Sequence, residues 1–265
     1  QMEEKKDMRK SMIYLQKYGI STKLAAKIYQ RYGMKVHQIL EENPYRLADD
    51  IEGVGFRTAD EIAARIGIHT DSDYRIRSGL FYILQQAVAE GHIYLPEELL
   101  LRRAKVLLGI EIEDIEKYIM DLCMERKTVM KEKDGKVIVY PAHYYYMELN
   151  TAKMLNDLDI DCQMPEDMEK RLRAVEEKEK IELDPLQHKA VIESIKHGLL
   201  ILTGGPGTGK TTTINTMIQF FESEGLSILL AAPTGRAAKR MTEATGYEAQ
   251  TIHRMLELTG MPEDD

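Results

Sequence analysis

Residues 204–211 constrain this chain more than any other stretch. They read Gly-Gly-Pro-Gly-Thr-Gly-Lys-Thr and fit the pattern G-x-x-x-x-G-K-[ST] without a mismatch. An apolar run at 199–202 predicts a strand before them, and apolar residues at helical spacing over 212–221 predict a helix after them. A strand, a tight glycine turn and a helix start therefore follow one another, as in an α/β nucleotide-binding domain.

The residue types of this loop suit a polyphosphate. Glycines let successive backbone N–H groups turn around an anion, and the helix start adds the positive end of its dipole. Lys210 is expected to reach the β- and γ-phosphates, and Thr211 to give its hydroxyl to Mg²⁺, which makes them the candidate catalytic pair. A turn that only joins strand to helix would explain neither residue. The expected nucleotide contacts are Gly204, Gly205, Pro206, Gly207, Thr208, Gly209, Lys210, Thr211 and Thr212.

The composition fits an ordinary multidomain protein. A length of 265 residues suffices for about two or three domains. We find neither an apolar run of the roughly 18 residues that span a membrane nor a signal-peptide pattern, so we expect a cytoplasmic protein without a membrane partner. Cys123 and Cys162 lie far apart and have no metal-ligand spacing. The net charge of −8 argues mildly against coating of nucleic acid, although a local groove can still be basic.

An internal repeat occupies the range 1–70, where many residues recur at the constant offset that separates Gly19 from Gly53. Two copies of one small unit are the simplest account. The matched pairs are Gly19 and Gly53, Ser21 and Gly55, Ala25 and Ala59, Ile28 and Ile62, Arg31 and Arg65, and Gly33 and Gly67.

The second copy resembles the helix-hairpin-helix family, on an apolar-Gly-apolar-Gly turn and a following helix of small and apolar residues over 51–63. In that family the hairpin amides and the helix start hold a nucleic-acid phosphate. The resemblance implies DNA contacts at Gly53, Gly55, Arg57 and Thr58, with a purely structural tight turn as the alternative. Ser21 replaces the second glycine in the first copy, where packing is the expected role.

The next segment is expected to order as helix 74–90, strand 92–94, a helix starting near Pro96, helix 112–125, and strands 128–133 and 136–140 around Asp134-Gly135. This order resembles a winged helix. Acidic residues outnumber basic ones in the third helix, so it would repel phosphates, and we expect a scaffold or protein-contact role. The aromatic run 143–146 fits either base stacking or core packing and stays unassigned.

A charge-rich run over 166–180 has apolar residues at helical spacing and predicts a solvated connecting helix. Beyond it, four runs resemble the opening motifs of superfamily 1 DNA helicases of the RecD/TraA type. These runs are Leu-x-x-x-Gln ending at Gln187, Gly-Gly-Pro-Gly-Thr-Gly-Lys-Thr-Thr-Thr from 204, Ala-Pro-Thr-Gly-Arg-Ala-Ala-Lys-Arg-Met from 232, and Thr-Ile-His-Arg-Met-Leu from 251. With the upstream repeat, they resemble the longer RecD-like form that has an N-terminal extension.

The helicase resemblance implies roles for individual residues. Gln187 would read the adenine of ATP beside the phosphate loop. The single-stranded DNA contacts would be Pro233, Thr234, Arg236 and Lys239, followed by Thr251 and His253. For His253 a core-packed histidine is the alternative. The family uses ATP and Mg²⁺ to translocate 5′ to 3′ and separate single-stranded or forked DNA, in repair and recombination.

We therefore expect a multidomain chain. An all-α tandem helix-hairpin-helix at 1–70 is followed by a winged-helix-like α+β domain at 71–150, a linker helix at 151–182 and a partial α/β RecA-like lobe at 183–265. After Thr211 no apolar strand ends in Asp-Glu and no second lobe supplies an arginine finger, so we expect a piece of a longer helicase, nearly inactive alone. The alternatives are a DNA-binding or scaffold module with a vestigial nucleotide site, and a small P-loop kinase, in which the last two runs have no place.

Overall fold

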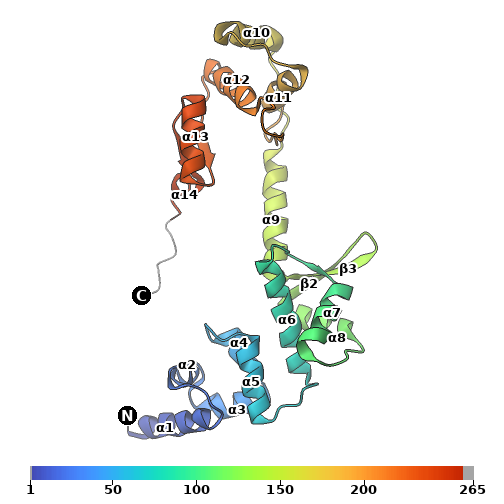
Figure 1. Ribbon diagram of the computed structural model, residues 1–265, viewed down its shortest axis with the longest axis vertical. Helices are drawn as coiled ribbons and strands as arrows, with labels where there is room; N and C mark the ends of the chain where they lie inside the picture. The colour runs from blue at the N-terminus through green and yellow to red at the C-terminus, as the bar shows by residue number, and fades with distance from the viewer. Residues whose placement is uncertain (1, 259–265) are drawn as a thin grey trace. The chain divides into compact units, whose positions relative to one another are not determined.

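The computed structural model describes residues 2–258, and side chains over 7–258. It comprises two compact units, which meet in sequence between Asn150 and Thr151 (Figure 1). Residue 1, and residues 259–265 of the lobe expected at 183–265, lie outside the described part. None of the helices within the described part is long and apolar enough to cross a membrane.

Unit 1 begins with the repeat that the sequence predicts. Its first elements are α1 (Met2–Lys17), α2 (Thr22–Tyr32), η1 (Gly33–Lys35), α3 (Val36–Glu42), α4 (Arg46–Asp50) and α5 (Phe56–Ile66). Helices α2 and α5 both have 11 residues and start at equivalent positions of the two copies. Each is followed by a glycine with positive φ, 56° at Gly33 and 95° at Gly67. The structure confirms the repeat.

The two copies hold each other through hydrogen bonds to equivalent carbonyls. Arg65 at the end of α5 donates to the carbonyl of Tyr18 at 2.9 Å. Lys27 of α2 donates to the carbonyl of Glu52 at 3.4 Å, and Glu52 occupies in the second copy the position that Tyr18 occupies in the first. A Cβ at Gly19 would lie 2.5 Å from Nη1 of Arg65, so a larger residue there would displace the guanidinium group that bonds Tyr18. Each copy therefore holds the backbone residue that precedes the hairpin glycine of the other copy.

The rest of unit 1 combines helices with a small antiparallel sheet of order β1-β3-β2 (Figure 1). Its elements are α6 (Asp73–Ala89), β1 (Leu95–Pro96), α7 (Glu97–Leu108), α8 (Ile115–Met124), β2 (Thr128–Lys133), β3 (Lys136–Pro141) and α9 (Ala142–Leu158). The predicted hairpin is confirmed, with positive φ at Asp134 and Gly135. The strand expected at 92–94 is wrong, because the His92 N–H closes α6 by donating to Ala87 O at 2.8 Å and pairing begins only at Leu95.

One hydrophobic core runs through unit 1. It joins residues of the repeat, such as Leu15 and Ile62, to Leu84 of α6 and Val139 of β3. The two parts are also tied by a polar network in which Arg75 of α6 binds Asp60 of α5 through two hydrogen bonds, at 2.7 and 3.0 Å. The helix-hairpin-helix repeat and the sheet therefore form one packed body.

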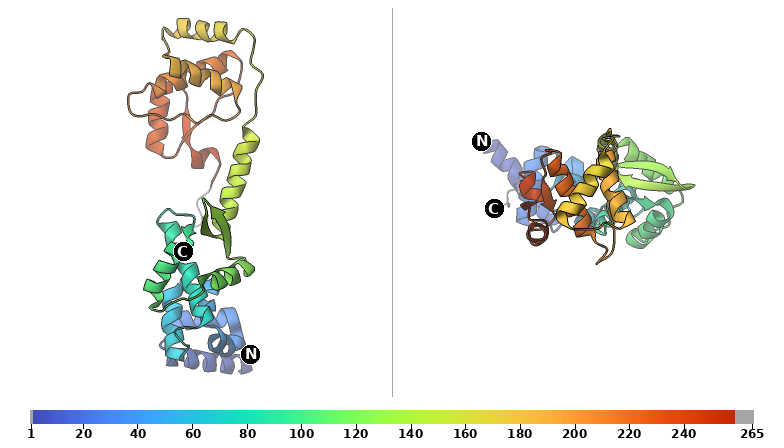
Figure 2. Two further views of the ribbon diagram at one scale, coloured as in Figure 1. Left: turned by 90° about the vertical axis from the view of Figure 1, so that its right-hand side faces the viewer. Right: turned by 90° about the horizontal axis from the view of Figure 1, so that it is seen from above.

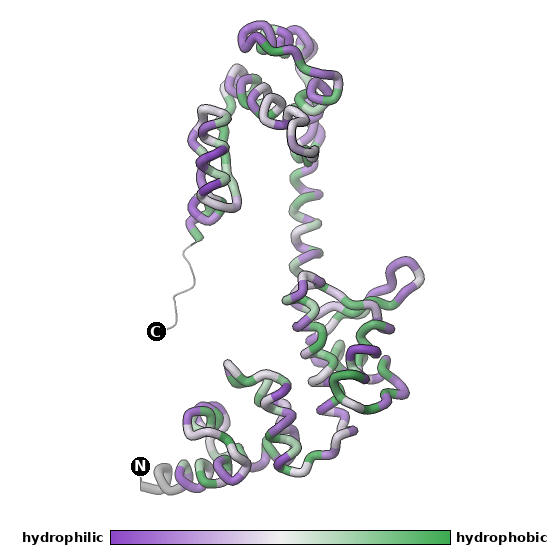
Figure 3. The backbone as a smooth tube through the Cα atoms, viewed as in Figure 1, coloured by the Kyte–Doolittle hydropathy of each residue, from purple (hydrophilic) through white to green (hydrophobic). Residues whose placement is uncertain are grey.

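Unit 2 contains α10 (Met168–Glu179), α11 (Pro185–Lys196), α12 (Lys210–Ser223), β4 (Leu230–Ala232), α13 (Gly235–Thr245), β5 (Ala249–Thr251) and α14 (Ile252–Met255). Figure 2 shows these elements from two further directions. The expected solvated helix over 166–180 needs correction: most residues of α10 are hydrophilic (Figure 3), but Leu172 and Val175 are buried against Val191 and Phe220. Helix α10 is thus part of the core of unit 2.

The predicted strands of this unit are shorter than expected. Residues 199–202 have no strand hydrogen bonding within the described part, and Ile201 is 78% exposed. The apolar run at 227–232 forms a strand only over β4, which pairs in parallel with β5, and Leu229 is 76% exposed. Apolar runs predict burial on both faces of a sheet, but a strand also needs a hydrogen-bonded neighbour.

Candidate functional site: a phosphate loop and two strand ends

The phosphate loop forms a turn that only glycine accommodates well. Gly207 and Gly209 have φ of 76° and 74°, in the left-handed region. Residues 203–208 are exposed, and Lys210 begins the 14-residue helix α12 directly after the turn. The loop amides and the positive end of the α12 dipole therefore face solvent together, as an anion site requires.

Lys210 folds back over the loop. Its Nζ donates to the carbonyls of Gly204 and Gly205, both at 2.5 Å, and Thr208 Oγ1 donates to Gly205 O at 2.9 Å. Gly204 is confined as well, because a Cβ there would lie 2.7 Å from the Thr208 hydroxyl. The ammonium group thus already lies within the loop, and an arriving phosphate would exchange with the carbonyls as its partner.

Gln187 connects α11 to the loop. Its Oε1 accepts from the Asp184 N–H at 3.0 Å while the Asp184 carboxylate accepts from the Gln187 N–H, which completes a capping box. Its Nε2 donates to the Gly209 carbonyl at 3.5 Å, and a Cβ on Gly209 would lie 2.0 Å from that nitrogen. The glutamine expected to read adenine thus lies at the loop, where its amide also fixes the start of α11.

Thr211 and Thr212 follow in the first turn of α12. Thr211 is exposed, whereas Thr213 is buried and bonds Gly209 O at 3.1 Å. The described residues hold no cluster of three or more His, Cys, Asp or Glu side chains that would bind a metal ion by themselves. A single threonine hydroxyl fits Mg²⁺ only when phosphate oxygens and water complete its coordination, which is the usual manner for this ion.

The candidate DNA threonines lie at one edge of the parallel strand pair. Ala232 of β4 pairs with Thr251 of β5, so Thr234 and Thr251 both lie at the carboxyl ends of adjacent strands. The hydroxyl of each caps the helix that follows, by accepting from Ala237 N and Arg254 N respectively, both at 3.2 Å. Ligands of open α/β sheets bind at this edge.

Basic side chains extend from the same edge. Arg236 and Lys239 are both exposed and lie three residues apart on α13, hence on one side of the helix. Pro233 is exposed in the turn before it. His253 is exposed on α14, which excludes the core-packed alternative within the described part of the chain. Helix α13 also contacts the nucleotide helix, since Asn215 Nδ2 of α12 donates to Ala244 O at 3.0 Å.

The second hairpin of unit 1 presents its backbone to solvent. Gly53, with φ of 83°, and Gly55, which caps α5, are exposed together with Arg57 and Thr58. In the first copy the Ser21 hydroxyl occupies the cap position and accepts from Leu24 N at 3.4 Å. In the first copy the Ser21 side chain therefore caps the helix start. Gly55 has no side chain to do this in the second copy, so the amides there stay free of a side-chain cap.

Two parts of the chain match known protein families. Residues 4–94 match the family described as "ATP-dependent RecD2 DNA helicase HHH domain", and residues 187–264 match an "AAA domain". The "ATP-dependent RecD2 DNA helicase" of Deinococcus radiodurans is 30% identical over 262 residues, which cover 94% of this chain and 36% of that protein. These matches support a RecD-like superfamily 1 helicase with an N-terminal helix-hairpin-helix region.

Other relatives of this RecD-like chain match its last part. The "RecBCD enzyme subunit RecD" of Mycolicibacterium smegmatis is 38% identical over 93 residues, 26% of this chain and 17% of that subunit. The "ATP-dependent DNA helicase dda" of Enterobacteria phage T4 is 39% identical over 71 residues, 26% of this chain and 16% of that protein. The chain thus spans about a third or less of the curated relatives it matches.

We did not predict from the sequence that several residues of the RecD-like site form hydrogen bonds with neighbouring residues of the site. Asp184 followed by Pro185 is a helix-start signal, but we did not expect the Gln187 amide to close the capping box. The signal was available, because Asp followed three residues later by Gln is a capping-box pattern. The caps formed by Thr234 and Thr251 were equally readable, since each threonine precedes a helix.

Proposed function

We propose that this chain carries the ATP-binding loop and the first single-stranded DNA contacts of an ATP-dependent DNA helicase that translocates 5′ to 3′. ATP with Mg²⁺ would occupy the loop at 204–211, held by its amides, Lys210 and Thr211. Single-stranded or forked DNA would contact Thr234, Arg236 and Lys239 and then Thr251 and His253. A second DNA contact would be made by the hairpin at Gly53 to Thr58.

The observation that carries the proposal is the packing of α12 on α13. Helix α12 begins at the phosphate loop, and α13 begins directly after Thr234, so the Asn215–Ala244 hydrogen bond joins the two candidate sites. When Lys210 exchanges its carbonyl partners for phosphate, the start of α12 gains a charged ligand. A displacement of α12 is then transmitted to the DNA-side helix through a direct contact.

The chain's own groups have defined tasks in this scheme. The glycine amides and Lys210 neutralise phosphate charge, and the Thr211 hydroxyl is available to Mg²⁺, which would supply further charge stabilisation of the phosphates when bound. The Thr234 hydroxyl accepts its cap bond through oxygen and keeps its proton for donation to a DNA phosphate. Arg236 and Lys239 add salt-dependent attraction.

The region between the repeat and unit 2 is assigned a supporting part. We infer a winged-helix-like scaffold over 71–150 that offers a protein-contact surface rather than a major-groove reader. Its third helix, α8, begins at an acidic cap formed by Asp114 and includes Glu116 and Asp121. Such a surface repels phosphates.

Titration of the chain with a fluorescent ATP analogue and Mg²⁺, with and without single-stranded DNA, tests the coupling. We expect Lys210→Ala to weaken nucleotide binding at least about tenfold, since it removes a charge-assisted bond. Lys189→Ala, an exposed lysine on α11, is the matched control and should bind normally. DNA should change the affinity of the unaltered chain for the nucleotide. By linkage, the nucleotide should then change its affinity for DNA by the same factor. Equal affinity of Lys210→Ala and the control would overturn the proposed site.

A further inference from the structure

The sheet of unit 1 has one face against the core and one outward face, and strand register assigns side chains to each. Lys131 pairs with Ile138 and Lys133 pairs with Lys136, so these three lysines point to the same side. Val139 and its partner Leu95 alternate to the other side, where both are buried in the core. The three lysines therefore belong to the outward face.

Four tyrosines form a continuous series that begins on this outward face and continues onto α9. The ring centroids of Tyr94 and Tyr140 lie 5.1 Å apart, those of Tyr140 and Tyr145 5.3 Å, and those of Tyr145 and Tyr146 5.3 Å. The rings come from the segment before β1, from β3 and from α9. Tyr140 is only 7% exposed beneath its neighbours, but Tyr146 is 55% exposed. The series thus ends in an accessible ring.

Two of the lysines lie over these rings, and all three lysines are exposed. The Nζ of Lys131 lies 5.2 Å from the Tyr145 centroid, and that of Lys133 lies 5.4 Å from the Tyr94 centroid. Within residues 7–258 no carboxylate lies within salt-bridge distance of Lys131, Lys133 or Lys136. We call the four tyrosines and three lysines together the tyrosine–lysine face.

Acidic groups near this face do not cancel its charge. Glu132 lies between Lys131 and Lys133 in β2 and therefore points to the opposite side of the sheet. Glu148 of α9 interacts with Tyr140 and, after the burial of that ring, is the next cause of its raised pKa. Asp134 at the hairpin turn and Glu148 both act on Lys133, so three lysines stand against two carboxylates near this face.

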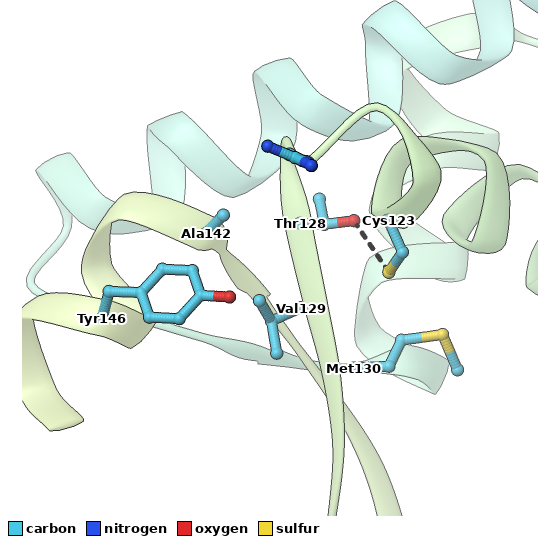
Figure 4. A pocket seen from close by; sticks show the side chains of 7 residues that line it. Cys123, Thr128, Val129, Met130, Ala142 and Tyr146 are labelled. Carbon is cyan, nitrogen blue, oxygen red and sulfur yellow. Dashed lines mark hydrogen bonds between the residues drawn. The ribbon is translucent and has the colours of Figure 1, made fainter.

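A pocket of about 700 Å³ adjoins the face. It lies at the edge strand β2, where Val129 of the outward face and Thr128 and Met130 of the other face line it together with Cys123, Arg126, Ala142 and Tyr146. In Figure 4 the Tyr146 ring extends over the pocket with its hydroxyl directed toward Val129. The pocket therefore continues the aromatic series and adds a fourth cation, beside an accessible ring.

We propose that the tyrosine–lysine face binds single-stranded DNA, with bases stacked on the Tyr146 end of the series and phosphates paired with the lysines. Every base has a π-face, so aromatic rings beside cations bind a single strand with little regard for sequence. The helix-hairpin-helix turn, in contrast, offers groups that bind phosphates but no aromatic ring for a base. The tyrosine–lysine face lies on unit 1 alone and does not include the nucleotide site. If the face does not bind DNA, the proposed motor function remains intact.

Fluorescence anisotropy with two labelled probes of equal length, oligo-dT and an abasic oligomer, separates stacking from charge. Without nucleotide, we expect Tyr146→Ala to weaken oligo-dT binding about tenfold and abasic binding less than about twofold, because stacking contributes about that much per base. Lys131→Gln with Lys133→Gln should weaken both probes and lower the salt slope by about 1.4. Arg102→Gln is the charge control, since Arg102 is exposed on α7, which packs on the buried face.

Two outcomes overturn the proposal. Either Tyr146→Ala binds oligo-dT as the unaltered chain does, or it weakens both probes equally, and each result would show that no base stacks on the ring. Arg236→Ala tests the DNA contact proposed on unit 2 independently. A loss with Tyr146→Ala but none with Arg236→Ala supports the tyrosine–lysine face and contradicts the DNA contact proposed on α13.

Discussion

Arg75 is the residue whose removal should destabilise unit 1 most clearly through polar contacts. Its guanidinium donates twice to Asp60, at 2.7 and 3.0 Å, and once each to the carbonyls of Thr70 and Leu108, both at 2.9 Å. The side chains of Arg75 and Asp60 are only 12% and 26% exposed. Asp60 also accepts from the Tyr45 hydroxyl at 2.6 Å. One side chain thus ties α5, α6 and the end of α7 together.

Arg75→Met keeps the aliphatic volume and removes these four bonds. Breaking a buried ion pair costs about 3–5 kcal/mol, and the residual exposure of Asp60 with its remaining tyrosine partner reduces the expected loss to about 2–4 kcal/mol. Asp60→Asn combined with Arg75→Met should cost less than the sum of the two single changes, because the double variant leaves no unpaired charge.

Urea unfolding followed by tyrosine fluorescence measures this loss in unit 1 specifically. Of the 14 tyrosines, only Tyr247 follows residue 150, and the chain has no tryptophan. Arg102→Met, on an exposed arginine of α7, is the control and should change the free energy of unfolding by less than about 0.5 kcal/mol. If Arg75→Met falls within the range of the control, the network does not join the two parts of unit 1.

Three further changes have directions set by the structure. Burial raises the pKa of the Asp60 carboxyl, but the hydrogen bonds from Arg75 and Tyr45 and the arginine charge outweigh it and lower that pKa overall. The stability that ionised Asp60 contributes is therefore complete above its unfolded pKa of about 3.9 and is lost as the pH falls through its folded pKa. In an acid titration followed by circular dichroism, Asp60→Asn should therefore lose less stability than the unaltered chain. Gly19→Ala should destabilise unit 1 by about 1 kcal/mol more than Gly53→Ala in thermal melts, because both have positive φ but only Gly19 meets an arginine. Gly209→Ala should reduce nucleotide-analogue binding at least about tenfold without unfolding the chain, since its Cβ would displace the neighbouring glutamine amide.

Local sequence patterns predicted most elements of unit 1. The repeat located α2 and α5 and their terminal glycines, and Asp134-Gly135 located the hairpin, because turn chemistry and helix caps are local. The strand at 92–94 failed because the tight turn that closes α6 occupies those residues, and pairing then depends on β3, which lies far along the chain. Sequence proximity carries no information about that partner.

The candidate site was predictable as a set of residues but not as an arrangement. The phosphate-loop pattern named Lys210 and Thr211, yet nothing local indicated that the ammonium would bind the Gly204 and Gly205 carbonyls. The tyrosine–lysine face was hidden for another reason. Lys131 and Lys133 alternate with Glu132, so the charge of the run averages out until the strand separates its two faces.

Strand separation by the natural protein that contains residues 1–265 tests the central claim most directly. A labelled duplex is supplied with a 5′ or a 3′ single-stranded tail, with ATP and Mg²⁺, and unaltered protein is compared with Lys210→Ala and with the Lys189→Ala control. The account predicts ATP-dependent separation of the 5′-tailed duplex alone, retained by Lys189→Ala and abolished by Lys210→Ala. Separation that persists in Lys210→Ala, or that requires the 3′ tail, would contradict it.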